Sequence, residues 1–376
     1  MVDVVAVRTS FVVFDPRVFK IVNSLRKRYS VLVLGWNRKG DKSETKADYI
    51  TDLDLFNFKT RFGVPTRSSY FYMIFYFIIF WIWVLIKLIK HRPRVVHAFD
   101  LDALIPCLIY KTIFRKKLVF DATVRYAMAY IPTKFKTLYS AVNSLEECLA
   151  SRADVLINGW DKELSTFRRR PKKCVTIINC TDDYSLHQAK LEKDKNAEKI
   201  LKLVYTGGIR TGRSLDNVAA AVKGLDDFEF ILAGLTVDKQ LLEDILRIPN
   251  VKYKGFLESR DALVLEANAD AMIGMYDMNV PWNSITAPSK HFEAMMCGIP
   301  IITNASSELV NDVDCGIIVD YDDVEQIRTA VTSLRNVQLR SRLGRNGRAA
   351  FLEKYNWTKM EEKLFEVYEN LMQKYK

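Results

Sequence analysis

Short runs of apolar residues alternate with longer amphipathic stretches over the first half of the chain. The apolar runs predict buried strands at 2–7, 31–34, 95–97, 118–121 and 155–158. Helical spacing of apolar positions predicts helices over 16–28, 101–114 and 135–151. Buried strands that alternate with helices are typical of a parallel sheet that is covered on both faces. The first half therefore has an α/β pattern.

A second alternating series follows a polar, charged segment at 181–199. It predicts strands at 201–206, 228–233, 251–254, 270–274, 299–303 and 315–319. It also predicts helices at 215–223, 238–247, 259–267, 323–334, 338–354 and 357–375. A chain of 376 residues suits two domains of ordinary size. We expect an N-terminal domain at 1–180, a linker at 181–200, a second domain at 201–356 and a C-terminal helix at 357–376.

One stretch of the first half does not fit an ordinary surface helix. Residues 70–86 carry no charge, are dense in aromatic side chains, and are followed by a basic cluster. About 17 apolar residues are close to the lower limit for crossing a bilayer. Strands on both sides of the stretch belong to one sheet, so both of its ends must stay on one side of a membrane. We expect a helix over 70–90 that lies in the membrane interface, and the alternative is a wholly buried core helix.

The composition of the chain limits the classes of binding partner that are expected. The net charge is +11, which favours anionic partners such as nucleotide phosphates or an acidic membrane surface. The six cysteines show no C-x-x-C pair and the four histidines are dispersed, so neither a disulfide framework nor a metal site is predicted. No motif that interleaves aromatic and basic residues accompanies the charge, so nucleic acid is not an expected partner.

The most informative motif lies at 287–300. Ser289 can cap a short helix, and Lys290 and Glu293, three residues apart, project from the same side of that helix. Gly298 suits the left-handed position that ends a helix, and Pro300 opens the next strand. A lysine for phosphate and a carboxylate for sugar hydroxyls would together suit a nucleotide diphosphate. The alternative is an ordinary capped helix with an i,i+3 ion pair.

Two further segments have glycines at predicted strand ends. Gly207 and Gly208 follow the strand at 201–206, where backbone N–H groups can approach a phosphate closely, and Arg213 adds a guanidinium fork. The same residues also suit a mere tight turn. Gly255 and Phe256 follow the strand at 251–254, where backbone groups can meet a nucleotide base, or where the strand simply ends.

These segments together resemble the donor site of family 4 glycosyltransferases, which are retaining enzymes of the GT-B architecture. The resemblance implies an α/β fold with two Rossmann-like parallel-sheet domains facing a cleft and a C-terminal helix that returns to the N-domain. It implies catalytic roles for Arg213, Lys290 and Glu293. It implies donor contacts for Gly207, Gly208, Arg210, Gly255, Phe256 and Ser289.

The chain departs from the family pattern at three positions. Relatives often carry a second glutamate where this chain has Ile285, an arginine where it has Gly208, and a histidine where it has Thr123. The segment 288–293 instead resembles a subset of the family with the pattern Pro-Ser-Lys-x-Phe-Glu. Retaining transfer in this fold does not usually require a protein nucleophile, so these departures leave catalysis possible.

The first half resembles the family in the segment 97–102, which has the pattern His-x-x-Asp-x-Asp at a predicted strand end. Ligands bind at such strand ends in open parallel sheets. The resemblance implies acceptor contacts for Asp15, Arg17, His97, Asp100 and Thr123. As alternatives, Asp100 or Asp102 caps the following helix, and Arg17 is a surface cation at a helix start.

The sequence therefore predicts a hexosyltransferase-type enzyme that uses a nucleotide-diphosphate sugar and requires no cofactor or metal. We expect retention of configuration and a lipid-linked glycan acceptor, such as a polyprenyl-phosphate glycan. We expect peripheral attachment to the cytoplasmic side of the cell membrane. The alternatives are a nucleotide-sugar epimerase of the same fold and a catalytically silent GT-B subunit that anchors a partner to the membrane.

Overall fold

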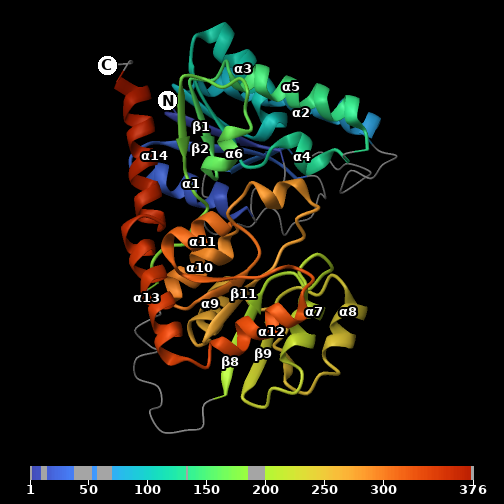
Figure 1. The fold of residues 1–376 in the computed structure, drawn as a ribbon. Helices are drawn as coiled ribbons and strands as arrows, with labels where there is room; N and C mark the ends of the chain where they lie inside the picture. The colour runs from blue at the N-terminus through green and yellow to red at the C-terminus, as the bar shows by residue number, and fades with distance from the viewer. Residues whose placement is uncertain are drawn as a thin grey trace. The chain divides into compact units, whose positions relative to one another are not determined.

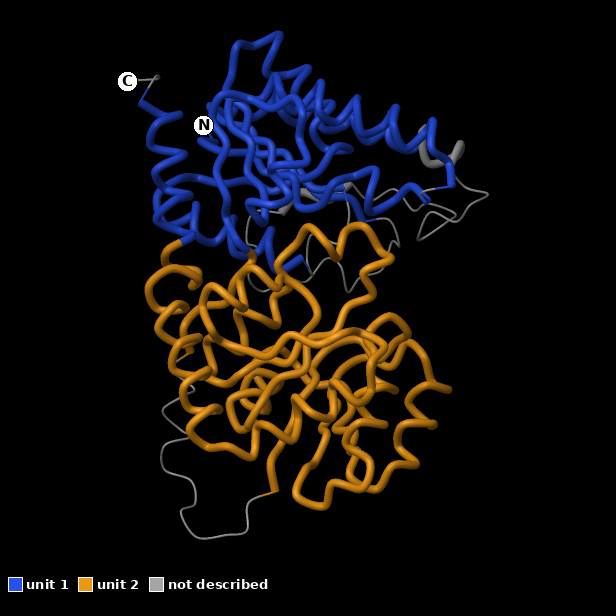
Figure 2. The backbone as a smooth tube through the Cα atoms, viewed as in Figure 1, with its two compact units in different colours: residues 1–178, 360–376 blue, residues 179–359 orange. Residues whose placement is uncertain are grey.

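The computed structural model describes residues 2–9, 15–37, 53–56, 70–132, 134–184 and 200–373. The chain forms two compact units, the first of residues 1–178 with 360–376 and the second of residues 179–359 (Figure 2). Most of the predicted linker, residues 185–199, lies outside the described residues. Each unit is built on one parallel sheet with helices on its faces (Figure 1), which confirms the predicted α/β fold.

The first unit contains a seven-stranded sheet of order β3-β2-β1-β4-β5-β6-β7, in which all neighbours pair in parallel. Its strands are β1 (Val4–Arg8), β2 (Val31–Trp36), β3 (Leu53–Phe56), β4 (Val95–Phe99), β5 (Lys117–Ala122), β6 (Val155–Asn158) and β7 (Lys173–Thr176). Its helices are α1 (Pro16–Arg26), α2 (Tyr70–His91), α3 (Asp100–Phe114), α4 (Tyr126–Tyr130), α5 (Lys136–Ala150) and α6 (Asp161–Ser165). The last helix of the chain, α14 (Trp357–Met372), also belongs mostly to this unit.

Helices α2, α3 and α5 cover one face of this sheet. Their buried side chains share a core with the strand residues Val96 and Ala98. Because successive strand residues point to opposite faces, His97 between them points to the other face. There its Nδ1 lies 2.7 Å from the hydroxyl of Tyr368 on α14. Both faces of the sheet are therefore covered, as its apolar strands require.

The second unit contains a six-stranded parallel sheet of order β10-β9-β8-β11-β12-β13. Its strands are β8 (Leu201–Thr206), β9 (Phe228–Ala233), β10 (Val251–Tyr253), β11 (Ala271–Gly274), β12 (Ile301–Thr303) and β13 (Gly316–Ile318). Its helices are α7 (Leu215–Val222), α8 (Lys239–Ile245), α9 (Ser259–Ala267), α10 (Ser289–Cys297), α11 (Ser307–Val313), α12 (Val324–Ser333) and α13 (Val337–Glu353), with a 3-10 turn at Pro281–Ser284. Helices α7, α8 and α12 share one core with the sheet.

The described part of the chain contains no helix that is long and apolar enough to cross a bilayer. Helix α2 has one buried face, on which Phe80, Val84 and Leu88 are fully covered. Its opposite face is open, with Ile82 54% and Ile86 58% exposed. The alternative of a wholly buried helix is therefore wrong.

Candidate active site

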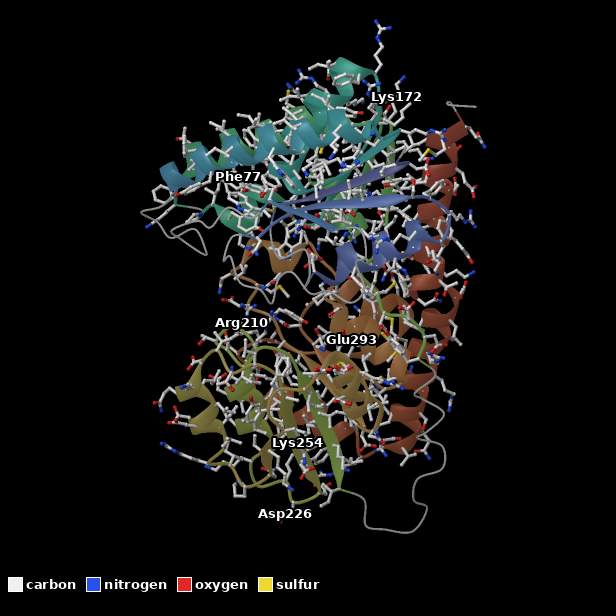
Figure 3. All side chains as sticks on the ribbon, turned by 180° about the vertical axis from the view of Figure 1, so that it is seen from behind. Phe77, Lys172, Arg210, Asp226, Lys254 and Glu293 are labelled. Carbon is white, nitrogen blue, oxygen red and sulfur yellow. The ribbon has the colours of Figure 1, made fainter. Side chains whose placement is uncertain are left out.

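The second sheet has a topological switch point between β8 and β11. The chain builds outward from β8 through β9 to β10 and then returns to place β11 on the other side of β8. Loops that leave neighbouring strands in opposite directions open a crevice at the carboxyl edge, where ligands bind in folds of this kind. The predicted donor residues follow β8, β10 and β11, so all of them belong to this edge. Figure 3 shows Arg210 and Glu293 on that end of the sheet, with Asp226 at the opposite end.

Helix α10 presents the residues of the 287–300 motif. Pro288 holds the N-cap position with an extended backbone, and no side chain caps the helix. The predicted capping role of Ser289 is therefore wrong, because Ser289 is already the first helical residue. Gly298 ends the helix in the left-handed conformation at φ +63°, as predicted, and its N–H bonds back into the last turn.

Lys290 is held between two carboxylates. Its Nζ lies 3.0 Å from Oε1 of Glu266 on α9, and it forms a second ion pair with Oε2 of Glu293 on its own helix. The hydroxyl of Thr206, at the end of β8, donates to the same Oε1 of Glu266. Thr206 follows Tyr205, which packs in the core under α7, so its side chain emerges on the opposite face beside α9.

Burial and charge set the protonation of this cluster. Burial raises the pKa of Glu266 to about 7, and the neighbouring Glu293 adds to the rise, while Lys290 opposes it. Burial alone would lower the pKa of Lys290, but Glu293 and Glu266 more than offset it and hold the ammonium form. The side chains of Lys290 and Glu293 are 18% and 16% exposed, against 1% for Glu266. Lys290 and Glu293 are thus reachable by a ligand, and Glu266 pairs with Lys290 from the buried side.

The glycine turn after β8 is tightly packed. The N–H of Gly207 donates to Ala233 O at 2.8 Å, and Gly207 has φ +148°. A Cβ atom on Gly234, which follows β9, would lie 1.9 Å from the carbonyl oxygen of Gly207. The hydroxyl of Tyr205 donates to Gly208 O at 3.1 Å. The turn therefore needs Gly234 beside Gly207 for packing, while a Cβ atom on Gly208 would meet only Val237, at the ordinary contact distance of 3.8 Å.

Arg213 and Tyr276 meet across the switch point. The guanidinium carbon lies 4.4 Å from the centre of the Tyr276 ring. Arg213 precedes α7 on the β8 side, and Tyr276 follows β11. Asn304 fixes the backbone of Tyr276 through bonds of 2.9 and 2.8 Å to its N–H and carbonyl. Stacking leaves the guanidinium edge available for anion binding.

The remaining donor predictions lie on the same edge with fewer contacts. Arg210 is exposed in the loop after β8. The carbonyl of Gly255 accepts from Gly234 N at 2.9 Å, so the turns after β9 and β10 are joined. Phe256 is 69% exposed, which leaves its ring free to cover a ligand. Ile285, at the position of the missing glutamate, is buried.

The first sheet has its own switch point, between β1 and β4. Arg8, at the end of β1, forms ion pairs with Asp100 at the start of α3 and, at 2.9 Å, with Asp15. Asp15 also caps α1 by accepting from Arg17 N at 3.0 Å. Arg8 is not among the residues predicted from the sequence, because its partners lie 7 and 92 residues away along the chain.

Asp100 is an unusual residue at this edge. Its backbone has φ +63°, a left-handed conformation that non-glycine residues rarely adopt. Its Oδ1 accepts from the N–H of Thr123 at 2.9 Å and from the Thr123 hydroxyl at 2.5 Å. Phe99 is the N-cap of α3 and no side chain caps that helix, so the capping alternative for Asp100 or Asp102 is wrong. Asp102 instead accepts a bond from Thr9.

Arg17 and His97 lie inside the first unit. Arg17 is 5% exposed, forms an ion pair of 2.8 Å with Asp121, and donates to Ile177 O at 2.7 Å. The surface-cation alternative for Arg17 is therefore wrong. His97 is fully buried, with Nε2 3.4 Å from Asp121 and Nδ1 on Tyr368. Burial does not favour their predicted contacts with an acceptor, since both side chains bond to groups of the fold.

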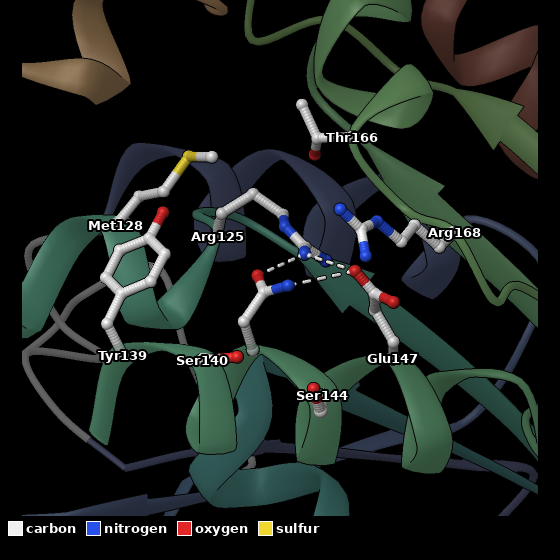
Figure 4. Close-up of a pocket in the computed structure, with 9 residues that line it drawn as sticks. Arg125, Met128, Tyr139, Ser140, Ser144, Glu147, Thr166 and Arg168 are labelled. Atoms are coloured by element: carbon white, nitrogen blue, oxygen red, sulfur yellow. Dashed lines mark hydrogen bonds and ion pairs between the residues drawn. The ribbon is translucent and has the colours of Figure 1, made fainter. Parts of the chain in front are cut away.

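A cavity of about 310 Å³ lies in the first unit beside α4 and α5 (Figure 4). Its lining is formed by Arg125, Met128, Tyr139, Ser140, Asn143, Ser144, Glu147, Thr166 and Arg168. Arg125 is fully buried, pairs with Glu146 at 3.2 Å and Glu147 at 3.1 Å, and stacks 3.7 Å from the centre of the Phe167 ring. The sequence did not single out this cavity, because its side chains come from three separate segments.

Within the described ranges, no group of His, Cys, Asp and Glu side chains is arranged to hold a metal ion. The described cysteines are all free thiols.

The chain resembles known proteins in the sequence of its second unit and in its fold. Residues 201–336 match the family model described as glycosyl transferases group 1. No match is found among curated proteins. Sucrose-phosphate synthase from Thermosynechococcus elongatus is similar in structure with a TM-score of 0.74, at 16% identity over 99% of both chains.

HepE from Anabaena, solved in complex with UDP, has a TM-score of 0.71 at 16% identity, covering 98% of this chain and 100% of HepE. Its complex with UDP-glucose has a TM-score of 0.69 at 16% identity, with the same coverage. At these identities the likeness establishes the fold, which is the GT-B architecture.

Proposed function

We propose that this chain, an enzyme with a glycosyl transferases group 1 domain on the GT-B fold, transfers a hexosyl group from a nucleotide-diphosphate sugar to a glycan acceptor. The observation that carries the proposal is the Lys290–Glu266–Glu293 cluster beside Arg213 at the switch point of the second sheet. Two cations and one reachable carboxylate converge there. The two cations can bind a diphosphate, and the carboxylate can accept hydrogen bonds from the hydroxyls of a ribose or hexose. UDP and UDP-glucose in the HepE complexes support a uridine nucleotide as the first donor to try.

Each side chain has a distinct role in this proposal. The Lys290 ammonium and the Arg213 guanidinium bind the diphosphate and stabilise the charge that develops on it as the sugar leaves. Glu293 accepts hydrogen bonds from ribose hydroxyls. Glu266 positions Lys290 without touching the donor.

We further propose that transfer retains the configuration of the sugar, as in the family 4 subset that the Pro-Ser-Lys-x-Phe-Glu motif resembles. The bond between the anomeric carbon and the diphosphate oxygen breaks, and a bond to the acceptor oxygen forms on the same face. The acceptor hydroxyl gives its proton to the leaving diphosphate. No protein nucleophile takes part.

We place the acceptor on a lipid carrier at the cytoplasmic face of the membrane. This part of the proposal is supported by the open apolar face of α2, on which Phe75, Ile82 and Ile86 are more than half exposed. A lipid carrier would present its glycan to a protein that rests on the same surface. The switch point of the first sheet, at Arg8 and Asp100, is the edge proposed to receive it.

Replacing Glu293 tests the donor role. We expect Glu293→Ala to weaken UDP-glucose binding about tenfold, which corresponds to ~1.4 kcal/mol, and to leave the protein folded. Isothermal titration measures the affinity, with Glu325→Ala on the exposed start of α12 as the control. Equal affinity in wild type and Glu293→Ala would remove Glu293 from the donor site.

The same purified protein separates the two alternative functions. A nucleotide-sugar epimerase would convert its nucleotide sugar in the absence of any acceptor, which NMR of the sugar detects. A silent subunit would neither bind nor convert any nucleotide sugar.

A further inference from the structure

Helix α2 exposes a continuous apolar stripe. Five side chains on it are between 45% and 62% exposed: Phe75, Ile78, Ile82, Ile86 and Ile89. Spacings of three and four residues bring them to one side of the helix. The side chains of Phe80, Val84 and Leu88 fill the sheet-facing side. A helix on the surface of a globular protein normally has a polar outer face, so this one lacks the pattern that water would favour.

The stripe continues onto the two neighbouring helices. Helix α3 contacts both α2 and α5, and all three contribute to the core on the same face of the first sheet. Ile109 and Ile113 of α3 are 41% and 66% exposed, and Leu138 and Leu145 of α5 are 54% and 46% exposed. We call the outer surface of α2, α3 and α5 the helical face. Exposed apolar surface on this scale marks an interaction site.

Charge on the helical face has one sign. Residues 75–94, 103–117 and 134–145 contain ten lysines and arginines and no aspartate or glutamate. The four acidic residues in the remaining turns of α3 and α5 are buried or half-buried: Asp100, Asp102, Glu146 and Glu147. Lys90, Arg92 and Arg115 are exposed at the C-terminal ends of α2 and α3. Favourable interaction with the helix dipoles explains cations at those ends, but it does not explain why none of the acidic side chains of the three helices is exposed among the described residues.

We propose that the helical face is a docking surface for an anionic lipid bilayer. The three helices lie parallel to the membrane plane, with their aliphatic side chains at the acyl boundary and their cations on lipid phosphates. A second copy of this chain is a poorer occupant, because two such faces would bring like charges together. This docking rests on the proposed function only for the lipid-linked acceptor.

The fold gives this docking a consequence for the site. Helices α2 and α3 each connect two parallel strands, so each helix runs antiparallel to the strands that it connects. Their N-terminal ends therefore lie at the carboxyl edge, where Asp100 begins α3 beside Arg8. A unit docked through the helical face holds that edge at the level of the membrane surface, within reach of a carrier-bound glycan.

Vesicle binding tests the proposal with the full chain. We expect it to co-sediment with phosphatidylcholine vesicles that contain phosphatidylglycerol, and to bind pure phosphatidylcholine at least about tenfold more weakly. We expect added salt to weaken the anionic binding. Equal binding to both vesicles, or no binding to either, would overturn the proposal.

Two variants locate the surface. Ile82→Gln with Ile86→Gln changes only open positions of α2, and we expect about a tenfold loss of vesicle binding. Leu235→Gln with Val237→Gln is the matched control, since these second-unit side chains are 61% and 62% exposed. Trp81 and Trp83 are unsuitable because both pack against the core of the first unit. Undiminished binding by the α2 variant would overturn the proposal.

The design separates this proposal from the proposed function. Vesicle binding is measured without donor, and UDP binding is measured without vesicles, so either can fail alone. Retained UDP affinity and an unchanged melting temperature show that the α2 variant is folded. A dimer in light scattering that the α2 variant abolishes, without vesicle binding by the wild type, would assign the helical face to a second copy and overturn the proposal.

Discussion

The ammonium nitrogen of Lys290 lies 3.0 Å from Oε1 of Glu266, a carboxylate that is 1% exposed and comes from a different helix. Through this contact the buried end of α9 fixes a cation that otherwise belongs only to α10. Glu293 pairs with the same ammonium from the solvent side. The two carboxylates therefore have different proposed roles: Glu266 positions the Lys290 ammonium, and Glu293 binds the ligand.

Replacing Lys290 should lower both the stability of the fold and the affinity for UDP. We expect Lys290→Met to lower the free energy of unfolding by about 3 kcal/mol, because it leaves the buried Glu266 without its charged partner. UDP binding should fall as well. Urea unfolding and isothermal titration measure the two effects.

A double variant separates the effect of Lys290 on stability from its effect on UDP binding. Adding Glu266→Gln to Lys290→Met should restore part of the lost stability, because the buried carboxylate is then neutral. It should not restore UDP affinity, since the cation is still absent. Recovery of both would mean that Lys290 acts on the fold alone.

Arg213 should not tolerate replacement by lysine. Arg213→Lys keeps the charge but loses the planar fork and the stacking on Tyr276, so UDP should bind about tenfold more weakly. The melting temperature of the free protein should change little. Arg260→Lys, at the exposed start of α9, is the control. An affinity equal to that of the wild type would show that the guanidinium geometry is not used.

Stability should fall as the pH rises from 5 to 8. Burial raises the pKa of Glu163 to about 8, against a bond from Gly159 N–H and the charge of Arg17, which both lower it. The folded chain therefore keeps a proton that the unfolded chain releases near pH 4.5. Stability from this group is complete below about pH 4.5 and is lost as the pH approaches 8. Glu146 and Glu266, with pKa values raised to about 7 chiefly by burial, act in the same direction.

Glu163→Gln should reduce this dependence on pH. The amide cannot ionise, so the variant should gain stability on the order of 3 kcal/mol relative to wild type on going from pH 5 to pH 8. Thermal unfolding at both pH values measures the difference, with Glu325→Gln as the exposed control. A parallel decline in Glu163→Gln and wild type would contradict the buried, protonated state.

The bond between His97 and Tyr368 should hold α14 on the first unit. Tyr368→Phe removes the hydroxyl that lies 2.7 Å from the buried His97 Nδ1, so we expect a loss of about 1–3 kcal/mol of stability. UDP affinity should not change, because both residues lie outside the second unit. Tyr130→Phe, with a ring that is 48% exposed, is the control. Unchanged stability in Tyr368→Phe would show that the bond contributes little.

Long, periodic elements could be predicted from the sequence because their signal is local. The predicted helices at 259–267 and 338–354 match α9 and α13 to within one residue at each end. The left-handed end of α10 at Gly298 also follows from local rules. Short elements such as β3, β7, α4, α6 and α11 were not predicted, because four to seven residues carry little periodicity.

The site was predictable only in part, because its partners are distant in sequence. Lys290 and Glu293 were found from their spacing, but Glu266 lies 24 residues from Lys290 and 60 from Thr206. Sequence alone cannot place such residues together. The wrong assignment of a cap to Ser289 has a related cause, since Pro288 adopts the cap conformation without any side-chain bond.

Thermal stabilisation by nucleotides tests the central claim most directly. Purified protein is titrated with a panel of nucleoside diphosphates and their sugars, and its melting temperature is followed beside that of the Lys290→Met, Glu266→Gln double variant. We predict a saturable rise for the diphosphate and sugar of one base, uridine first, and no rise for the double variant. The absence of a rise with every nucleotide would contradict the donor site at Lys290 and Glu293.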